Sequence, residues 1–338
     1  MKKIALSKLN DLLTAISTST AVFAPQCVKG SVNYDVWSAD SAVVLEKTTV
    51  KSAKDVFFPQ VENMMEFKTE GKNISIEQVN PSTDKFVVFG VRACDVKSFS
   101  ILDSVFMVAP KDSFYTARRN NGTVVSLACN KPDETCFCTT FKIEAHAPKG
   151  DVETYIVGDE LYWLPLTAKG EALTAVVSDM LEDADATAVD AVKEDIKVIM
   201  TKLPLADLSL DGFGQDKVKE LFNRPEWEAL SNSCVGCGTC TYVCPTCQCY
   251  DIRDYNTGKE VKRYRCWDSC MVSDFTMMAH GNIRPNKVQR FRQRFMHKLA
   301  YYPDNNNGEF SCVGCGRCLA KCPVSMNIVK VIKTIGGK

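Results

Sequence analysis

The chain has 338 residues, 45% of them hydrophobic, and its 41 basic and 41 acidic side chains balance to a formal net charge of zero. This composition predicts about two folded domains, and the balanced charge gives no reason to expect a nucleic acid as partner. Seventeen cysteines, without a secretory signal or an apolar run long enough to span a membrane, predict a reducing cytoplasm and metal binding rather than disulfides.

The first 205 residues mix strand and helix signals, which predicts an α/β domain over residues 1–205. We expect an amphipathic helix at 1–13 and strands at 20–25, 41–45, 74–79, 123–129, 152–157 and 161–164. A further strand, rich in β-branched and aromatic residues, begins at Lys85 and runs into Asp95. We expect Asp95 to be the N-cap of a helix over 96–106.

Four cysteines follow two of these expected strands. Cys94 and Cys129 come at strand ends, and Cys136 and Cys138 lie just beyond. They could be buried, unligated thiols, because free cysteine packs as a small hydrophobe. A C-x-C pair at a strand end suits ligation better than packing, and a cubane needs four thiolates. We therefore predict a 4Fe-4S cluster on Cys94, Cys129, Cys136 and Cys138.

Two later stretches, 233–245 and 311–323, share the spacing C-x2-C-x2-C-x3-C-P. This run binds 4Fe-4S clusters, and in two-cluster ferredoxins the fourth cysteine of each run binds the other cluster. The sequence therefore predicts one cluster on Cys234, Cys237, Cys240 and Cys322, and another on Cys312, Cys315, Cys318 and Cys244. Zinc ribbons also use paired C-x2-C, but the repeated third cysteine and Cys-Pro favour clusters.

Residues 206–338 are expected to form an α+β two-cluster ferredoxin-like domain, entered by a helix at 215–230 and carrying a large insertion at 246–310. The insertion contains Cys247, Cys249, Cys266 and Cys270. It also contains a basic stretch, 284–298, which could be a solvated helix face, neutralise the anionic clusters or dock an acidic partner.

Together, several segments resemble the iron-sulfur beta subunit of soluble sulfhydrogenases and the similar A subunit of anaerobic sulfite reductase. They are residues 90–95, 102–103, 136–138, 244–249, 267–271, 290–298 and 312–318. The resemblance implies a relay of single electrons that links a flavin- and NAD(P)H-binding subunit with a catalytic hydrogenase, sulfite reductase or heterodisulfide-reductase-like subunit. The family pattern includes Cys247, Cys249 and Cys270, which become further candidate metal ligands, whereas Cys266 lies outside it.

The residues support that role independently. There is no flavin loop, no nicotinamide loop and no conventional acid-base centre, so we expect no catalytic residue and no flavin or nicotinamide bound by this chain itself. We expect a cytoplasmic electron-transfer subunit from an anaerobic host, without nucleic acid or membrane contacts. Three alternatives remain. The chain could be the A subunit of anaerobic sulfite reductase, or an iron-sulfur enzyme in which one cluster offers an iron without a cysteine ligand to substrate. In the third alternative the clusters only stabilise the fold.

Overall fold

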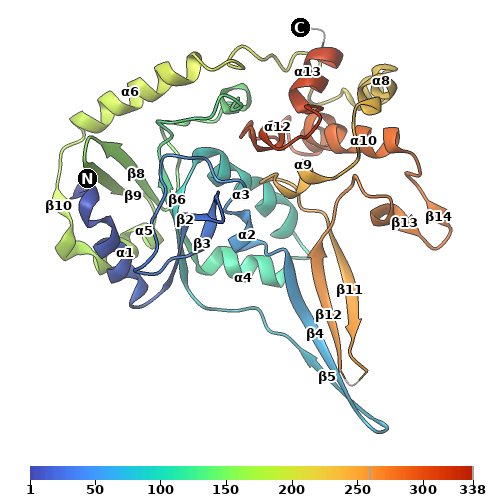
Figure 1. Cartoon of the computed structure of the whole chain (residues 1–338), viewed down its shortest axis with the longest axis horizontal. Helices are drawn as coiled ribbons and strands as arrows, with labels where there is room; N and C mark the ends of the chain where they lie inside the picture. The colour runs from blue at the N-terminus through green and yellow to red at the C-terminus, as the bar shows by residue number, and fades with distance from the viewer. Residues whose placement is uncertain (259, 337–338) are drawn as a thin grey trace.

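The computed structural model describes residues 1–258 and 260–336. Its largest element is an eight-stranded mixed sheet in the N-terminal part, with strand order β10-β1-β9-β8-β7-β6-β2-β3 (Figure 1). The strands are β1 Lys2–Ala5, β2 Ala21–Val28, β3 Ser31–Val36, β6 Phe86–Val91, β7 Gly122–Leu127, β8 Val152–Val157, β9 Glu160–Pro165 and β10 Glu182–Asp183.

Helices cover both faces of this sheet. All six residues of β6 are buried, and β6 pairs in parallel with β2 and β7, as expected for a central strand covered on both sides. Apolar residues of α1 (Leu9–Ser17) and α5 (Ala168–Val176) pack on one face. The other face is covered by α2 Lys54–Phe57, α3 Ala93–Phe106, α4 Ser113–Asn121 and α6 Thr187–Thr201. The N-terminal part is therefore an α/β domain, as predicted.

Several local expectations were wrong. Residues 2–5 form a strand, so the first helix begins only at Leu9. Residues 41–45 form no strand, and only Val43 makes an isolated bridge to Gln26. The helix expected at 215–230 is divided into two short helices, because Pro225 cannot continue a hydrogen-bonded turn. Asp95 is not an N-cap: α3 already begins at Ala93, and Asp95 is fully buried in its first turn.

A second sheet joins distant parts of the chain into one arm. Its strands are β4 Val61–Glu70, β5 Asn73–Gln78, β11 Tyr250–Asn256 and β12 Glu260–Trp267, in the order β11-β12-β4-β5. β12 pairs antiparallel with β4, with Cys266 opposite Val61. This sheet projects from the body of the molecule in Figure 1. The hairpin of the expected insertion is thus built onto a hairpin of the N-terminal part.

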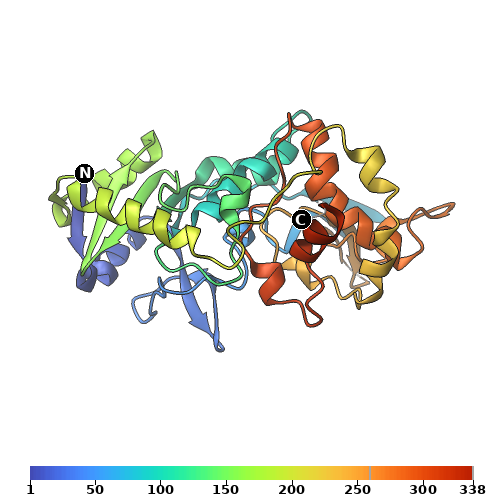
Figure 2. The same ribbon diagram turned by 90° about the horizontal axis from the view of Figure 1, so that it is seen from above.

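The C-terminal part is a group of short helices at the opposite end of the elongated molecule from the eight-stranded sheet (Figure 2). Its apolar core contains Trp227, Phe291, Phe295 and Ile332. No helix in the described ranges is both long and apolar enough to cross a membrane. The elements are α7 Val218–Phe222, α8 Glu226–Asn232, α9 Thr239–Tyr242, β13 Met277–Met278, β14 Gly281–Asn282, α10 Lys287–Met296, α11 Tyr302–Asn305, α12 Arg317–Ala320 and α13 Ile328–Gly336.

Candidate iron-sulfur centres

The two cysteine runs fold into similar loops. Gly236 and Gly238 in the first run, and Gly314 and Gly316 in the second, have φ angles between 56° and 73°. This left-handed region favours glycine, which has no Cβ to clash with the backbone. Gly238 and Gly316 each precede a one-turn helix, α9 and α12, and these two helices pack against each other. A curled backbone of this kind is what closely spaced thiolates need in order to turn toward one cluster.

The cysteines assigned to the second cluster surround one small cavity. Cys312, Cys315 and Cys318 line it together with Cys244, the last cysteine of the first run. Much of the remaining wall is apolar: Phe137, Val313 and Ile328. Four thiols in a largely apolar wall are a suitable donor set for a cubane, which binds one thiolate at each iron. The thiols are thus placed as the cross-over requires, and their ligation stays a prediction.

The first run lies closer to the surface. Cys237 is exposed, whereas Cys234, Cys240 and Cys322 are partly buried. Cys234 and Cys322 both pack against the C-terminal apolar core. Burial raises the pKa of the Cys240 thiol, and the neighbouring thiols of Cys234 and Cys237 raise it further. A raised pKa favours the neutral thiol. A bound metal reverses this preference, because cysteine ligates as the thiolate.

The four N-terminal cysteines also lie near one another. Cys94 is in the first turn of α3 rather than in a loop, and Cys138 begins a 3-10 turn. Burial, with Cys129 nearby, raises the pKa of the Cys138 thiol to about 12. Burial also raises the pKa of Cys136, and Cys129 and Cys138 add to that effect. In the described part of the chain, no three His, Cys, Asp or Glu side chains converge on one point as ligands of a single metal ion would.

The loop carrying Cys136 and Cys138 lies directly on the second cysteine run. The Phe137 N–H donates to the carbonyl oxygen of Gly314 at 2.8 Å. The Cys136 thiol lies 3.9 Å from the carbonyl oxygen of Cys315 and donates to it. A Cβ on Gly316 would lie 2.5 Å from the Thr135 carbonyl oxygen, so only glycine permits this approach. The N-terminal thiols and those of the second run therefore belong to one continuous region.

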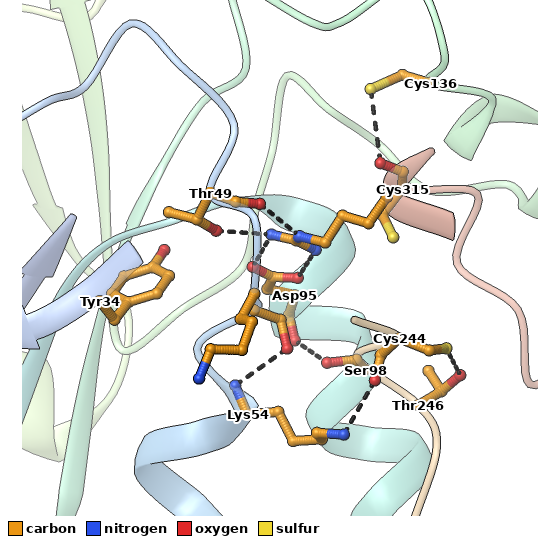
Figure 3. A network of polar contacts seen from close by, with 12 residues as sticks. Tyr34, Thr49, Lys54, Asp95, Ser98, Cys136, Cys244, Thr246 and Cys315 are labelled. Atoms are coloured by element: carbon orange, nitrogen blue, oxygen red, sulfur yellow. Dashed lines mark hydrogen bonds and ion pairs between the residues drawn. The ribbon is translucent and has the colours of Figure 1, made fainter. Parts of the chain in front are cut away.

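A buried ion pair between Arg317 and Asp95 connects the N-terminal group of thiols with the second cysteine run. Arg317, between Cys315 and Cys318, donates to both carboxylate oxygens of Asp95 at 2.6 and 2.8 Å. It also donates to the carbonyl and hydroxyl oxygens of Thr49 at 2.9 and 3.0 Å. Figure 3 shows Thr49, Asp95 and Cys315 around this contact. The sequence contains Arg317 inside the second run, but nothing in it identifies Asp95 as its partner 222 residues away.

The further candidate ligands in the expected insertion form two contacts. The thiol of Cys247 is hydrogen-bonded to that of Cys244, which lines the cavity of the second run. Cys249 and Cys270 are hydrogen-bonded to each other, and this bond lowers the pKa of Cys249 to about 7. Cys266 is on β12, opposite Val61 of the arm. The structure therefore brings Cys247 to the second centre and pairs Cys249 with Cys270.

Three basic residues complete the surroundings of the second run: Lys54, Arg294 and Lys298. Arg294 and Lys298 line the same cavity as Cys244 and Cys312. They come from the basic stretch at 284–298, one helical turn apart, so that both point to one side. Lys54, from α2, donates to the carbonyl oxygen of Cys244 at 3.0 Å (Figure 3). Sequence reasoning missed Lys54, which no motif marks.

The fold and the arrangement of thiols define an iron-sulfur protein of the two-cluster type. Residues 233–326 match the family described as a 4Fe-4S dicluster domain, which implies two 4Fe-4S clusters. The chain is 33% identical over 253 residues to Sulfhydrogenase 2 subunit beta from Pyrococcus furiosus, covering 74% of each protein. The chain therefore belongs to the family of sulfhydrogenase beta subunits and is an iron-sulfur electron-transfer subunit. No solved structure matches it.

Proposed function

We propose that the chain relays single electrons within a cytoplasmic complex, linking a flavin- and NAD(P)H-binding subunit with a catalytic hydrogenase subunit. The observation that carries the proposal is the continuity of the thiol groups. They extend from the exposed Cys237, through the cavity lined by Cys244 and Cys315, to the N-terminal group around Cys138. The relative from Pyrococcus furiosus, named as a sulfhydrogenase subunit, favours a hydrogenase over a sulfite reductase as the catalytic partner.

The proposed ligands follow the three groups of thiols. One cluster would take Cys234, Cys237, Cys240 and Cys322; the second Cys244, Cys312, Cys315 and Cys318; and the third Cys94, Cys129, Cys136 and Cys138. When bound, such clusters take up and release single electrons at potentials set by charge, hydrogen bonds and exposure. Cys247, Cys249 and Cys270 are proposed as secondary ligands or as neighbours that adjust the electronic environment.

The chain's own residues hold and insulate these groups. The apolar side chains of Phe137 and Ile328 exclude water from the second centre. The backbone of Gly314 brings the N-terminal loop into contact with the second run. We also propose that the chain is organised as residues 1–205 and 206–338, with the arm built from both parts.

The partner assignment is tested by purifying the complex anaerobically through a tag on this chain and identifying the other subunits by mass spectrometry. We expect hydrogenase and flavoprotein subunits and H2-dependent reduction of NAD(P)+. Recovery of sulfite reductase or heterodisulfide-reductase-like subunits in their place would overturn the hydrogenase assignment. Turnover of sulfite by the isolated chain would favour an enzyme with an open iron.

The ligand sets are tested separately with cysteine variants. Cys244→Ser should lose the iron of the second centre, although Cys244 belongs to the first run, whereas exposed Cys27→Ser should keep the full content. The measurement is iron and acid-labile sulfide per chain, with EPR spectra of the reduced protein. If Cys244→Ser instead lost the signal that depends on Cys234, the cross-over would be wrong.

A further inference from the structure

Three buried cations near the second run have no carboxylate partner in the part of the chain that the structure describes. Lys54, Arg294 and Lys298 are only 1%, 3% and 4% exposed. Among the described residues, none of the three forms an ion pair with an acidic side chain. Asp55, the carboxylate next to Lys54 in the chain, is instead paired with Lys51 at 2.6 Å. Buried charges are costly unless they are paired. The Trp267 ring, 3.6 Å from Lys54 Nζ, and the Phe295 ring, 4.5 Å from the Arg294 guanidinium, offset only part of that cost, so a nearby negative charge would stabilise all three cations.

The hydrogen bonds of the two lysines go to neutral oxygens. Lys54 Nζ donates to the carbonyl oxygens of Cys244 at 3.0 Å and Cys247 at 2.9 Å. Lys298 Nζ donates to the Thr246 hydroxyl at 2.6 Å and to the Ser311 carbonyl oxygen at 3.3 Å. These bonds fix both ammonium groups beside the cysteine loops without neutralising their charge.

Arg294 has unsatisfied donors at the cavity itself. Its Nη2 donates to the carbonyl oxygen of Cys240 at 3.1 Å, but its buried Nε and Nη1 have no hydrogen-bond partner among the described residues. The side chain lines the cavity formed by Cys244, Cys312, Cys315 and Cys318. A buried guanidinium with free N–H groups beside four thiols is suited to a strongly anionic group held by those thiols.

Two other buried arginines of this chain are paired with carboxylates. Arg317 is paired with Asp95, and Arg265 with Glu62 at 2.5 Å. Arg92 is a further buried cation for which no ion pair is found among the described residues, and it donates to the carbonyl oxygens of Ala128 and Leu45. Lys54, Arg294 and Lys298 differ from Arg92 in lying together around the second run. An oxidised 4Fe-4S cluster with four thiolates carries about two negative charges, which would balance most of their charge.

We propose that Lys54, Arg294 and Lys298 form an electrostatic seat for the cluster on Cys244, Cys312, Cys315 and Cys318, and stabilise its reduced form. Adding one electron to that group increases its negative charge by one without forming or breaking a bond. Three buried positive charges favour the more negative state and so raise the reduction potential. Lys54, Arg294 and Lys298 thus act on the cluster through their charge and do not ligate it. The inference rests on the ligand set proposed above.

The test is an EPR-monitored redox titration of anaerobically purified, full-length variants. In Arg294→Gln we expect one midpoint to become more negative. At a fixed potential, the ratio of reduced to oxidised cluster should fall at least tenfold, which is about 59 mV for one electron. Lys298→Gln and Lys54→Gln should move the same midpoint in the same direction. Arg294→Lys keeps the charge and should recover most of the shift.

Arg292→Gln is the matched control. Arg292 is on the same helix, but its guanidinium stacks 3.6 Å from the centre of the Phe222 ring and donates to the Phe222 carbonyl oxygen. Its removal should leave every midpoint unchanged. An unchanged midpoint in Arg294→Gln, at full iron content, would overturn the electrostatic seat while leaving the electron-transfer function intact.

Iron content separates the other outcomes. If Arg294→Gln loses the iron of the second centre while Arg294→Lys keeps it, the positive charge is needed to hold the anionic cluster, which supports the proposal. Equal loss in both variants would overturn it, because the requirement would then be for the shape of arginine. If the unaltered chain itself binds no iron, the proposed function fails first.

Discussion

Replacing Gly314 by alanine should break the contact between the N-terminal thiol loop and the second cysteine run. Gly314 has φ +56°, and a Cβ at this position would lie 2.5 Å from the carbonyl carbon of Phe137 and 2.7 Å from the Cα of Cys138. Cβ contacts under 3.0 Å are essentially never seen, so the two backbones must separate by about half an ångström. Both partners are backbone atoms and cannot rotate away.

Gly236 occupies the equivalent position in the first run and gives the matched control. Its φ is +73°, but an added Cβ would meet nothing within 4 Å. Gly236→Ala should therefore cost only the left-handed backbone term, about 1–2 kcal/mol. Gly314→Ala should cost that and an overpacking term of about 1–3 kcal/mol.

The assay is urea unfolding of each variant under anaerobic conditions, with the free energy of unfolding taken from the midpoint and slope. We expect Gly314→Ala to lose more stability than Gly236→Ala, and to lose the EPR signal of the N-terminal group first. Equal destabilisation by the two substitutions would refute the close approach of the two loops.

Two further changes test the buried charges. Arg317→Met leaves the fully buried Asp95 carboxylate without its cation and should cost about 3–5 kcal/mol of unfolding free energy, whereas the double variant with Asp95→Leu should recover most of the loss. Arg263→Met is the control: it breaks the exposed bidentate pair with Asp254 on the arm and should change the unfolding free energy little. A similar loss in Arg317→Met, the double variant and Arg263→Met would contradict the role of burial. His297 tests pH dependence, because burial, with Lys298 and Arg284 nearby, lowers its pKa to about 4. Its folded pKa lies below the unfolded value of about 6.5, so the unfolded chain binds more protons between these values, and acidification across this window should remove up to about 3 kcal/mol. His297→Phe should flatten this part of the profile of melting temperature against pH, and an unchanged slope would show that His297 does not titrate there.

The sequence was sufficient for features that depend on local spacing. The two cysteine runs and the buried strand from Phe86 to Val91 follow from short motifs and from continuous apolar residues. The family was also recognisable, because its cysteines are distributed along most of the chain. Pro225 itself marks the break in the helix expected at 215–230, because proline cannot continue a hydrogen-bonded turn.

Other features depend on contacts between distant residues, which local patterns do not encode. Aspartate is a preferred N-cap residue, but Asp95 forms a buried ion pair with Arg317 instead. Lys54 is one lysine among many in the sequence, and only the folded chain places it beside Cys244. The pairing of β12 with β4 likewise joins two hairpins, and the sequence of neither hairpin indicates that the other is its partner.

The most direct test of the account is the content of iron and acid-labile sulfide per chain after anaerobic purification, followed by a reductive EPR titration. We expect about twelve irons and twelve sulfides, corresponding to three 4Fe-4S clusters, and a loss of about four irons in Cys136→Ser. About eight irons, unchanged in Cys136→Ser, would confine the clusters to the two cysteine runs. Zinc in place of iron would contradict the electron-transfer account altogether.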